Sequence, residues 1–196
     1  MNASDSLVPL AMRLAECAHR RIDHRRKAPP GEDRPAYFLH LTEVAWLLLD
    51  SGLHDDELIA AAFLHDIIED CDYDQATLAT AVGNPRVVAM VVAVSETDKR
   101  QSWEDRQRQY RERLATLNDP LLLALSCADK TSNLTDMNRL MAKGYPVSSF
   151  TSRGFAAQQA KFVALDRLFR GRAPERLYGR FQQALAEFQI RGGALG

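Results

Sequence analysis

Residues 61–70 read AAFLHDIIED, a run of small and apolar residues that leads into a histidine and three carboxylates. The apolar spacing over 55–69 is typical of a buried helix, which places these polar groups where burial is costly. A helix C-terminus also carries partial negative charge, which disfavours carboxylates there by about 0.3–1 kcal/mol each. No Lys or Arg occurs between residues 55 and 85. A bound cation would reverse the sign of these unfavourable terms, so the stretch indicates a metal site.

The spacing within this stretch divides its polar residues into two pairs. Residues four apart lie on the same face of a helix, so we expect His65 to stack with Glu69 and Asp66 with Asp70. His65 and Asp66 would then reach one metal ion. Glu69 and Asp70 would lie one turn away, at the distance of a bound water or a substrate.

Polar residues interrupt two further apolar helices. His40 lies within AYFLHLTEVAWLLL, although a lone histidine in such a helix is more often an ordinary core residue. Asp129 and Asn133 lie four apart within LLLALSCADKTSNL, and a buried Asp needs a partner. Lys130 is a candidate partner, but we expect it to point about 100° away around the helix.

One divalent ion would offset the cost of burying polar residues in all three apolar segments, around His40, around His65 and Asp66, and around Asp129. Its ligands would be His40, His65, Asp66 and Asp129. Two imidazoles and two carboxylates suit Mn, Fe, Co or Zn, and a mixed nitrogen and oxygen set with open positions favours octahedral coordination. No cysteine joins the set, so a structural zinc site is disfavoured.

Length and composition bound the class of protein. The 196 residues are 46% hydrophobic and 26% charged with a net charge of −1, which predicts one soluble domain over residues 1–196. This balance gives no reason to expect a nucleic-acid or membrane partner, and no apolar run reaches membrane-spanning length. The N-terminus lacks a secretory pattern, and the three scattered cysteines read as reduced thiols. We therefore expect a cytoplasmic protein.

Helical periodicity dominates the chain and predicts an all-α fold. The predicted helices cover residues 5–22, 37–51, 55–69, 73–83, 85–95, 103–117, 120–142, 149–170 and 174–190. A Pro- and Gly-rich loop that is basic at its start separates the first two, over 24–35. The last residues, RGGALG, are expected to form a frayed tail.

The order His…His-Asp…Asp resembles the HD-superfamily metal phosphohydrolases, which are helical bundles. A finer resemblance, over about residues 10–170, is to the hydrolase domain of RelA/SpoT-type alarmone enzymes in their stand-alone form, the small alarmone hydrolases. The matching segments, in order, are HRRKAPPGEDRPAYFLH, FLHDIIEDCDYD, AVSETDK and SCADKTSNL.

The resemblance implies a role for each matching residue. The four candidate ligands named above would bind one Mn(II) ion. Glu69 and Asp70 would position or activate the attacking water and handle the proton, and Asn133 would hydrogen-bond near the scissile phosphate. Arg26 and Lys27 would contact the nucleotide, and Tyr37 would line its pocket. Two further candidate substrate contacts, Lys99 after SETD and Arg153, come from the sequence and not from matching family positions. We favour Arg26 over Lys27 for phosphate, because a guanidinium fork suits phosphate oxygens.

The family reaction removes the 3′-pyrophosphate of (p)ppGpp, which yields GDP or GTP and pyrophosphate. Some members also act on (p)ppApp or remove the 2′-phosphate of NADPH, so an HD phosphatase of NADPH or other nucleotides is the first alternative. The second is a non-catalytic HD module, but such a module would be expected to have lost ligands that this chain keeps. The chain leaves no room for a synthetase domain, so we expect it only to degrade the nucleotide.

The sequence departs from the family pattern at three places. The insertion APPGED makes the basic loop a variant of its own. Leu41 follows His40 where the family usually has proline. The family's later Arg and Tyr substrate contacts have no clean counterpart, and Arg153 is the nearest stand-in. The base preference therefore stays open, as does the oligomeric state, for which a homodimer is one alternative.

Overall fold

The computed structural model describes residues 6–29, 31–96 and 100–195. Within these ranges the regular structure is helical, apart from one isolated antiparallel bridge between Arg25 and Ala36. The elements in chain order are α1 (Leu7–Arg21), α2 (Phe38–Asp50), α3 (Asp56–Leu64), α4 (Ile67–Asp70), α5 (Gln75–Val82), α6 (Pro85–Val94), α7 (Trp103–Thr116), α8 (Pro120–Ala142), η1 (Val147–Ser149), α9 (Phe155–Phe169) and α10 (Glu175–Leu195). The predicted all-α class is therefore confirmed.

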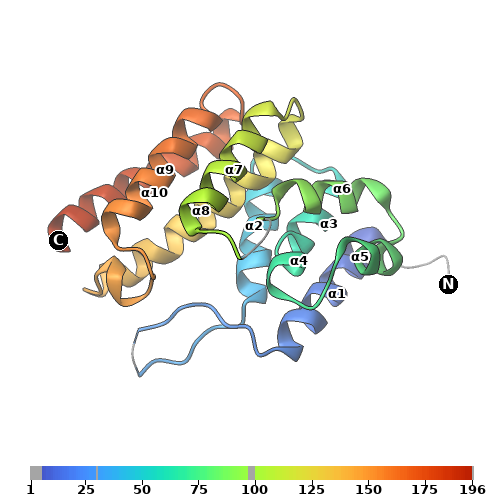
Figure 1. Ribbon diagram of the computed structural model, residues 1–196, viewed down its shortest axis with the longest axis horizontal. Helices are drawn as coiled ribbons and strands as arrows, with labels where there is room; N and C mark the ends of the chain where they lie inside the picture. Colours follow the sequence, from blue (N-terminus) through green and yellow to red (C-terminus); the bar gives the residue numbers. More distant parts are fainter. Residues whose placement is uncertain (1–5, 30, 97–99, 196) are drawn as a thin grey trace.

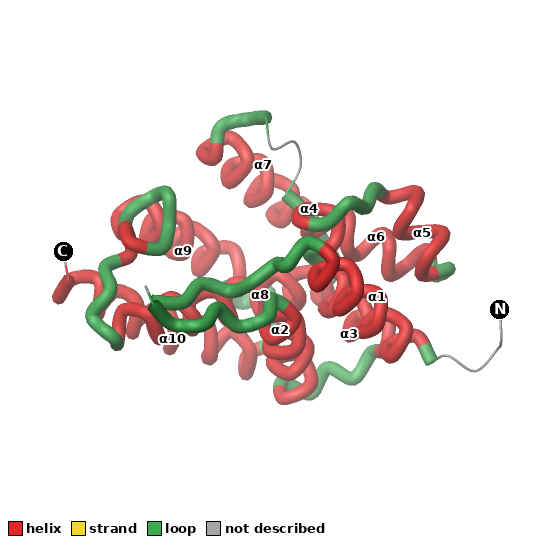
Figure 2. Tube along the Cα trace, turned by 90° about the horizontal axis from the view of Figure 1, so that it is seen from below, coloured by secondary structure: helices red, strands yellow, loops and turns green. Residues whose placement is uncertain are grey.

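Helices α2 and α8 pack against each other at the centre of the molecule (Figure 1). Helix α3 packs on α2, with α1 and α6 against it, while α10 covers α8 on the other side. The loop between α1 and α2 runs along the lower side of this central pair (Figure 2). None of the helices in the described ranges has the length and apolar character needed to cross a bilayer.

Local sequence signals explain most helix boundaries. The Asp55 side chain accepts a hydrogen bond from the Leu58 N–H (2.8 Å) and so caps α3. Asp119 caps α8 in the same way, and Pro120 occupies the first turn, where it costs no hydrogen bond. Gly83 ends α5 with a φ of +66°, a conformation that glycine adopts without strain.

The predicted helix over 55–69 is interrupted, which is the first correction. Helix α3 ends at Leu64 and α4 begins at Ile67, with Asp66 between them at φ −98° and ψ 0°. No Gly or Pro marks this break in the sequence. The expected rows of His65 over Glu69 and Asp66 over Asp70 therefore do not form one straight helical face.

The C-terminal helices also differ from the prediction. Residues 147–149 form a 3₁₀ turn and α9 begins only at Phe155, so the helix predicted from residue 149 starts later. Helix α10 continues to Leu195, and the expected frayed tail is helical up to that residue. The reason is packing, because Gly192 is buried against the ring of Phe155.

This close approach predicts that Gly192→Ala destabilises the fold. An added Cβ would lie 1.8 Å from the Phe155 ring, so the ring must move, at a cost of about 1–3 kcal/mol. We expect a melting temperature lower by several degrees in a thermal scan. Gly193→Ala is the matched control, since its Cβ would meet nothing within 4 Å and alanine favours the helix. Equal effects of the two substitutions would contradict this account of the packing.

Candidate functional site

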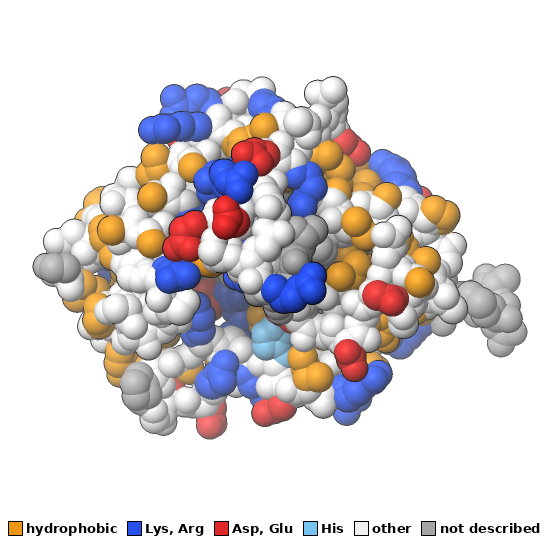
Figure 3. Space-filling model, viewed as in Figure 1, with side chains coloured by type: hydrophobic (Ala, Val, Ile, Leu, Met, Phe, Trp, Pro, Cys, Tyr) orange, Lys and Arg blue, Asp and Glu red, His pale blue; other side chains and the backbone are white. Residues whose placement is uncertain are grey.

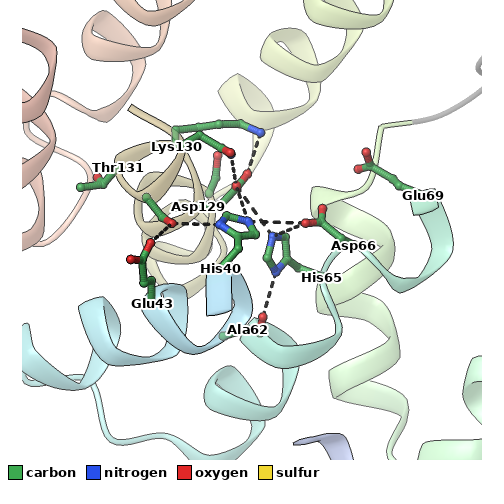
Figure 4. Close-up of polar contacts among 12 residues, drawn as sticks. His40, Glu43, Ala62, His65, Asp66, Glu69, Asp129, Lys130 and Thr131 are labelled. Atoms are coloured by element: carbon green, nitrogen blue, oxygen red, sulfur yellow. Dashed lines mark hydrogen bonds and ion pairs between the residues drawn. The ribbon is translucent and has the colours of Figure 1, made fainter. Parts of the chain in front are cut away.

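The structure brings the four predicted metal ligands together from three elements (Figure 4). His40 comes from α2, Asp129 from α8, and His65 and Asp66 from the break between α3 and α4. Asp66 Oδ2 lies 3.0 Å from His65 Nε2 and 3.5 Å from His40 Nε2. Asp129 Oδ1 lies 3.3 Å from His40 Nε2 and 3.7 Å from His65 Nε2. All four side chains point into one small buried space.

The donor set of this space fits a divalent cation. The Nε2 atoms of His40 and His65 are buried and make no hydrogen bond, whereas each Nδ1 atom is occupied. His40 Nδ1 lies 2.9 Å from Ser132 Oγ, and His65 Nδ1 lies 2.8 Å from the Ala62 carbonyl oxygen. One ligand atom each from His40, His65 and Asp66 lie within 4.8 Å of one another. Unpaired imidazole nitrogens beside carboxylate oxygens are the arrangement that a metal ion satisfies.

The charges of the four candidate ligands also favour a bound cation. Burial opposes a charge on His65, but the carboxylates of Asp66 and Asp129 outweigh it and raise the pKa of His65 well above its ordinary value. Burial likewise opposes ionisation of Asp66, yet the neighbouring histidines lower the pKa of Asp66. Without a metal, a proton on the imidazole takes the place of the cation. Metal binding at this site must therefore release protons.

Lys130 does contact Asp129, so the prediction that it points away is wrong. Its Nζ lies 2.6 Å from Asp129 Oδ2 and 4.9 Å from the centre of the Tyr110 ring. A lysine side chain is long enough to bend back along the helix to its neighbour. Asn133 Nδ2 donates to Asp129 Oδ1 at 2.5 Å. Both carboxylate oxygens of Asp129 are therefore contacted, Oδ2 by Lys130 and Oδ1 by Asn133, and Oδ1 is the oxygen that faces the histidines.

Glu69 lies on the far side of Asp66 from the histidines (Figure 4). Its carboxylate accepts a hydrogen bond from the Glu96 N–H. Burial and the nearby Asp66 charge raise the pKa of Glu69 to about 8. A carboxyl group with a pKa in this range can exchange a proton near neutral pH.

A cavity of about 290 Å³ reaches Asp70 and Asn133. Its lining comprises His24, Arg25, Arg26, Lys27, Arg34, Tyr37, Asp70, Asn133, Asp136, Met137 and Leu140. Figure 3, which shows the face of the molecule seen in Figure 1, shows a hollow with Lys and Arg side chains around it. Sequence reasoning missed Arg34, which the Pro-rich loop folds back so that its guanidinium donates to the Arg26 carbonyl (3.0 Å). The cationic lining suits an anionic ligand.

The two predicted phosphate contacts of the basic loop are not equivalent. Arg26 forms an ion pair with Asp136 at 2.7 Å, and both side chains are largely buried. Arg26 also donates to Asn133 Oδ1 at 3.3 Å. Lys27 lines this cavity and a neighbouring one of about 430 Å³, and it makes no ion pair within the described ranges. The preference for Arg26 over Lys27 therefore finds no support in the geometry.

Tyr37 lies against a candidate ligand of the metal. Its hydroxyl donates to Asp66 Oδ2 at 2.6 Å, and its ring stacks on His24 with centroids 3.7 Å apart. Burial and the Asp66 charge raise the pKa of Tyr37 well above its ordinary value, so the phenol stays protonated and keeps donating. Tyr37 also lines the cavity of about 290 Å³.

Of the two remaining candidates, only Arg153 lies within the described residues, and it lies away from the cavity. Arg153 pairs with Glu104 at 3.6 Å and lies 5.7 Å from the centre of the Trp103 ring, and it does not line either cavity described above. Lys99 lies outside the described residues.

Comparisons with known proteins show the family of the chain. A family model described as an HD domain matches residues 11–148. The guanosine-3′,5′-bis(diphosphate) 3′-pyrophosphohydrolase MESH1 of Danio rerio is 34% identical over 147 residues, which cover 74% of this chain and 77% of that protein. The MESH1 of Mus musculus is 34% identical over 131 residues, or 65% of this chain and 69% of that protein. A Vibrio cholerae enzyme named for the same activity is also 34% identical, but the chain spans only 17% of its length.

Solved structures share the fold. A metazoan ortholog of SpoT, described as hydrolysing ppGpp, superposes with a TM-score of 0.75 at 23% identity, covering 98% of this chain and 99% of that one. The lmo0812 protein of Listeria monocytogenes EGD-e superposes with a TM-score of 0.66 at 26% identity, covering 80% and 96% of the two chains. The predicted helical bundle of the HD type is thereby confirmed.

The raised pKa of Glu69 predicts a pH-dependent effect of Glu69→Gln on the stability of metal-free protein. Between pH 4.5 and about 8 the unfolded chain loses this proton while the folded chain keeps it, so the free energy of unfolding falls as pH rises. Glutamine does not titrate. The melting temperature of the variant relative to wild type should therefore be higher at pH 8 than at pH 5, by about 2–4 °C or more.

Thermal scans in a chelator at the two pH values measure this difference. Glu112→Gln, which removes an exposed carboxylate from α7, is the control and should show no such trend. If the melting temperature of Glu69→Gln relative to wild type stays constant or falls between pH 5 and pH 8, Glu69 does not have a raised pKa in the folded protein.

Proposed function

The chain belongs to the HD-domain family and, within it, to the guanosine-3′,5′-bis(diphosphate) 3′-pyrophosphohydrolases that include MESH1, and we propose that it hydrolyses the 3′-pyrophosphate of (p)ppGpp. The products would be GDP or GTP and pyrophosphate. One observation supports this most directly: two buried imidazole nitrogens without hydrogen bonds face two carboxylates, beside a cavity lined with cations. That combination suits metal-assisted hydrolysis of a polyanion.

The proposed cofactor is one divalent ion. Its donor set of two imidazoles and two carboxylates suits Mn, Fe, Co or Zn, and the family resemblance favours Mn(II) among them. It would be held by His40, His65, Asp66 and Asp129. When bound, such an ion polarises a phosphoryl oxygen and lowers the pKa of water. Tyr37 and Asn133 each donate to one of the ligand carboxylates and so fix its orientation.

The remaining residues would bind the substrate and move the proton. Glu69, whose pKa is raised by burial in the metal-free protein, is the proposed group that exchanges the proton, and Asp70 reaches the cavity where the phosphates would lie. Lys27 is the proposed phosphate contact, because it lines the cavity and forms no ion pair with another described residue. Arg26 is tied to Asp136 and Asn133, so its proposed role is to hold Asn133 at the edge of the cavity.

The surroundings of the chain form part of the same proposal. We treat the 196 residues as one functional unit that acts on a nucleotide in the cytoplasm and needs neither nucleic acid nor membrane. A homodimer stays a proposal that light scattering can test.

The proposed activity predicts products that depend on metal. Chelator-stripped protein is incubated separately with ppGpp, ppApp and NADPH, with and without Mn(II), and the products are resolved by anion exchange. We expect GDP and pyrophosphate only with Mn(II), and a loss of about 1,000-fold or more in Asp66→Ala, since that variant lacks a ligand. Asp56→Ala, an exposed carboxylate in the first turn of α3, is the control.

The other outcomes have defined meanings. ADP and pyrophosphate from ppApp would set the base preference. NADH with inorganic phosphate as the sole products would move the assignment to a dinucleotide phosphatase at the same site. No turnover of any of the three substrates by protein with bound metal would overturn the proposal.

The position of Lys27 at the cavity predicts a binding defect in Lys27→Ala. A lost hydrogen bond to a charged group costs about 1.5–3 kcal/mol, so KM for the hydrolysed nucleotide should rise about 10- to 100-fold with a smaller change in kcat. Steady-state kinetics measure both. Arg191→Ala on α10 removes a surface cation that pairs with Glu187 and should leave KM unchanged. An unchanged KM in Lys27→Ala would remove this residue from the binding site.

A further inference from the structure

The ring nitrogen of His40 that faces away from the proposed metal site contacts side chains that have no role in the proposed mechanism. His40 Nδ1 lies 2.9 Å from Ser132 Oγ, and Ser132 Oγ lies 2.9 Å from Glu43 Oε2. The second oxygen of Glu43, Oε1, pairs with Arg139 Nη2 at 2.8 Å. Figure 4 shows this chain of contacts running from Glu43 to the imidazole of His40, away from Asp66.

Counting hydrogens fixes the direction of these bonds. A carboxylate only accepts, so the single hydroxyl hydrogen of Ser132 goes to Glu43. Ser132 Oγ can then offer only a lone pair to His40, so Nδ1 of His40 must carry the hydrogen. A neutral imidazole has one such hydrogen, which leaves Nε2 with a bare lone pair. Nε2 is the atom that faces the carboxylates of Asp66 and Asp129.

The positions of these residues suit a fixed support. His40 and Glu43 lie three residues apart and so share one face of α2, while Ser132 and Arg139 lie seven residues apart and share one face of α8. Ser132 is fully buried, so water does not compete for its hydroxyl. The contacts therefore tie together the two central helices that carry His40 and Asp129.

The second histidine is held in a different way. His65 Nδ1 lies 2.8 Å from the Ala62 carbonyl oxygen, a backbone group that no side-chain substitution removes. A carbonyl also only accepts, so it selects the same Nδ1–H form in His65. The orientation of His40 thus depends on two replaceable side chains, and that of His65 depends on the fold alone.

We propose that Ser132 and Glu43 are positioning residues that hold His40 in its Nδ1–H form, so that the Nε2 lone pair is presented to a divalent ion. The proposal rests on the metal site of the proposed function, and it adds the residues that prepare that site before any metal or nucleotide arrives. Partners of this kind behind a ligating histidine contribute 10- to 100-fold to metal affinity.

The test measures Mn(II) binding and the hydrogen position of His40 without nucleotide. The dissociation constant of Mn(II) comes from titration calorimetry of chelator-stripped protein. The form of His40 comes from long-range proton–nitrogen correlation spectra of protein with ¹⁵N-labelled histidine. We expect Ser132→Ala to weaken Mn(II) binding 10- to 100-fold and to shift the His40 nitrogen signals away from the Nδ1–H pattern of the wild type.

Glu43→Gln is the second variant, since it keeps the shape of a partly exposed residue and should not disturb folding. A glutamine amide can donate to Ser132, which frees the Ser132 hydrogen to turn toward Nδ1. Some Nε2–H form of His40 should then appear, with a loss of Mn(II) affinity smaller than in Ser132→Ala. The matched control is Ser126→Ala, a buried serine on the same helix that bonds to the Tyr110 hydroxyl at 2.7 Å. It should change the affinity less than twofold.

Wild-type affinity and an unchanged nitrogen pattern in both Ser132→Ala and Glu43→Gln would overturn the proposal, as would equal losses of affinity in Ser132→Ala and Ser126→Ala. Failure of the proposed function gives a different result. A wild-type chain that binds Mn(II) and responds to these variants as expected, but hydrolyses none of the tested nucleotides, would remove the assigned reaction and leave the roles of Ser132 and Glu43 in place.

Discussion

The buried negative charge of Asp66 and Asp129 is the constraint on which the rest of the structure depends. Two ionised carboxylates close together in an apolar interior are stable only when donors and cations surround them. Tyr37, Asn133 and Lys130 each direct a donor at one of these oxygens. The surrounding helices are therefore arranged around a charge that the hydrophobic core cannot accommodate by itself.

The break between α3 and α4 illustrates how this constraint shapes the backbone. A continuous helix would place His65 and Asp66 about 100° apart around one axis. In the structure the chain leaves the helix after Leu64, and both side chains turn into the same space. The apolar residues on either side, Phe63 and Ile67, stay buried. The interruption thus joins a polar site to the core without exposing that core.

Sequence patterns predicted the features that depend on neighbouring residues. Helical periodicity located most of the helices, and the Asp55 cap and the Pro120 ring in the first turn mark the starts of α3 and α8. Polar residues within apolar helices identified the side chains that meet at the site, because burial makes such residues costly without partners. What the patterns missed depends on contacts across the chain or on the path of a long side chain. The pairing of Arg26 with Asp136 and the bend of Lys130 back to Asp129 are of this kind.

The candidate ligands come from three separate parts of the chain, at positions 40, 65–66 and 129. An ion held by all of them would close two long loops of the polypeptide and so act as a reversible cross-link. In the unfolded chain such closure is entropically unfavourable, and the disadvantage increases only slowly with loop length. The ion would bind the native state and not the unfolded one. The availability of metal would then determine how long the protein survives as well as whether it works.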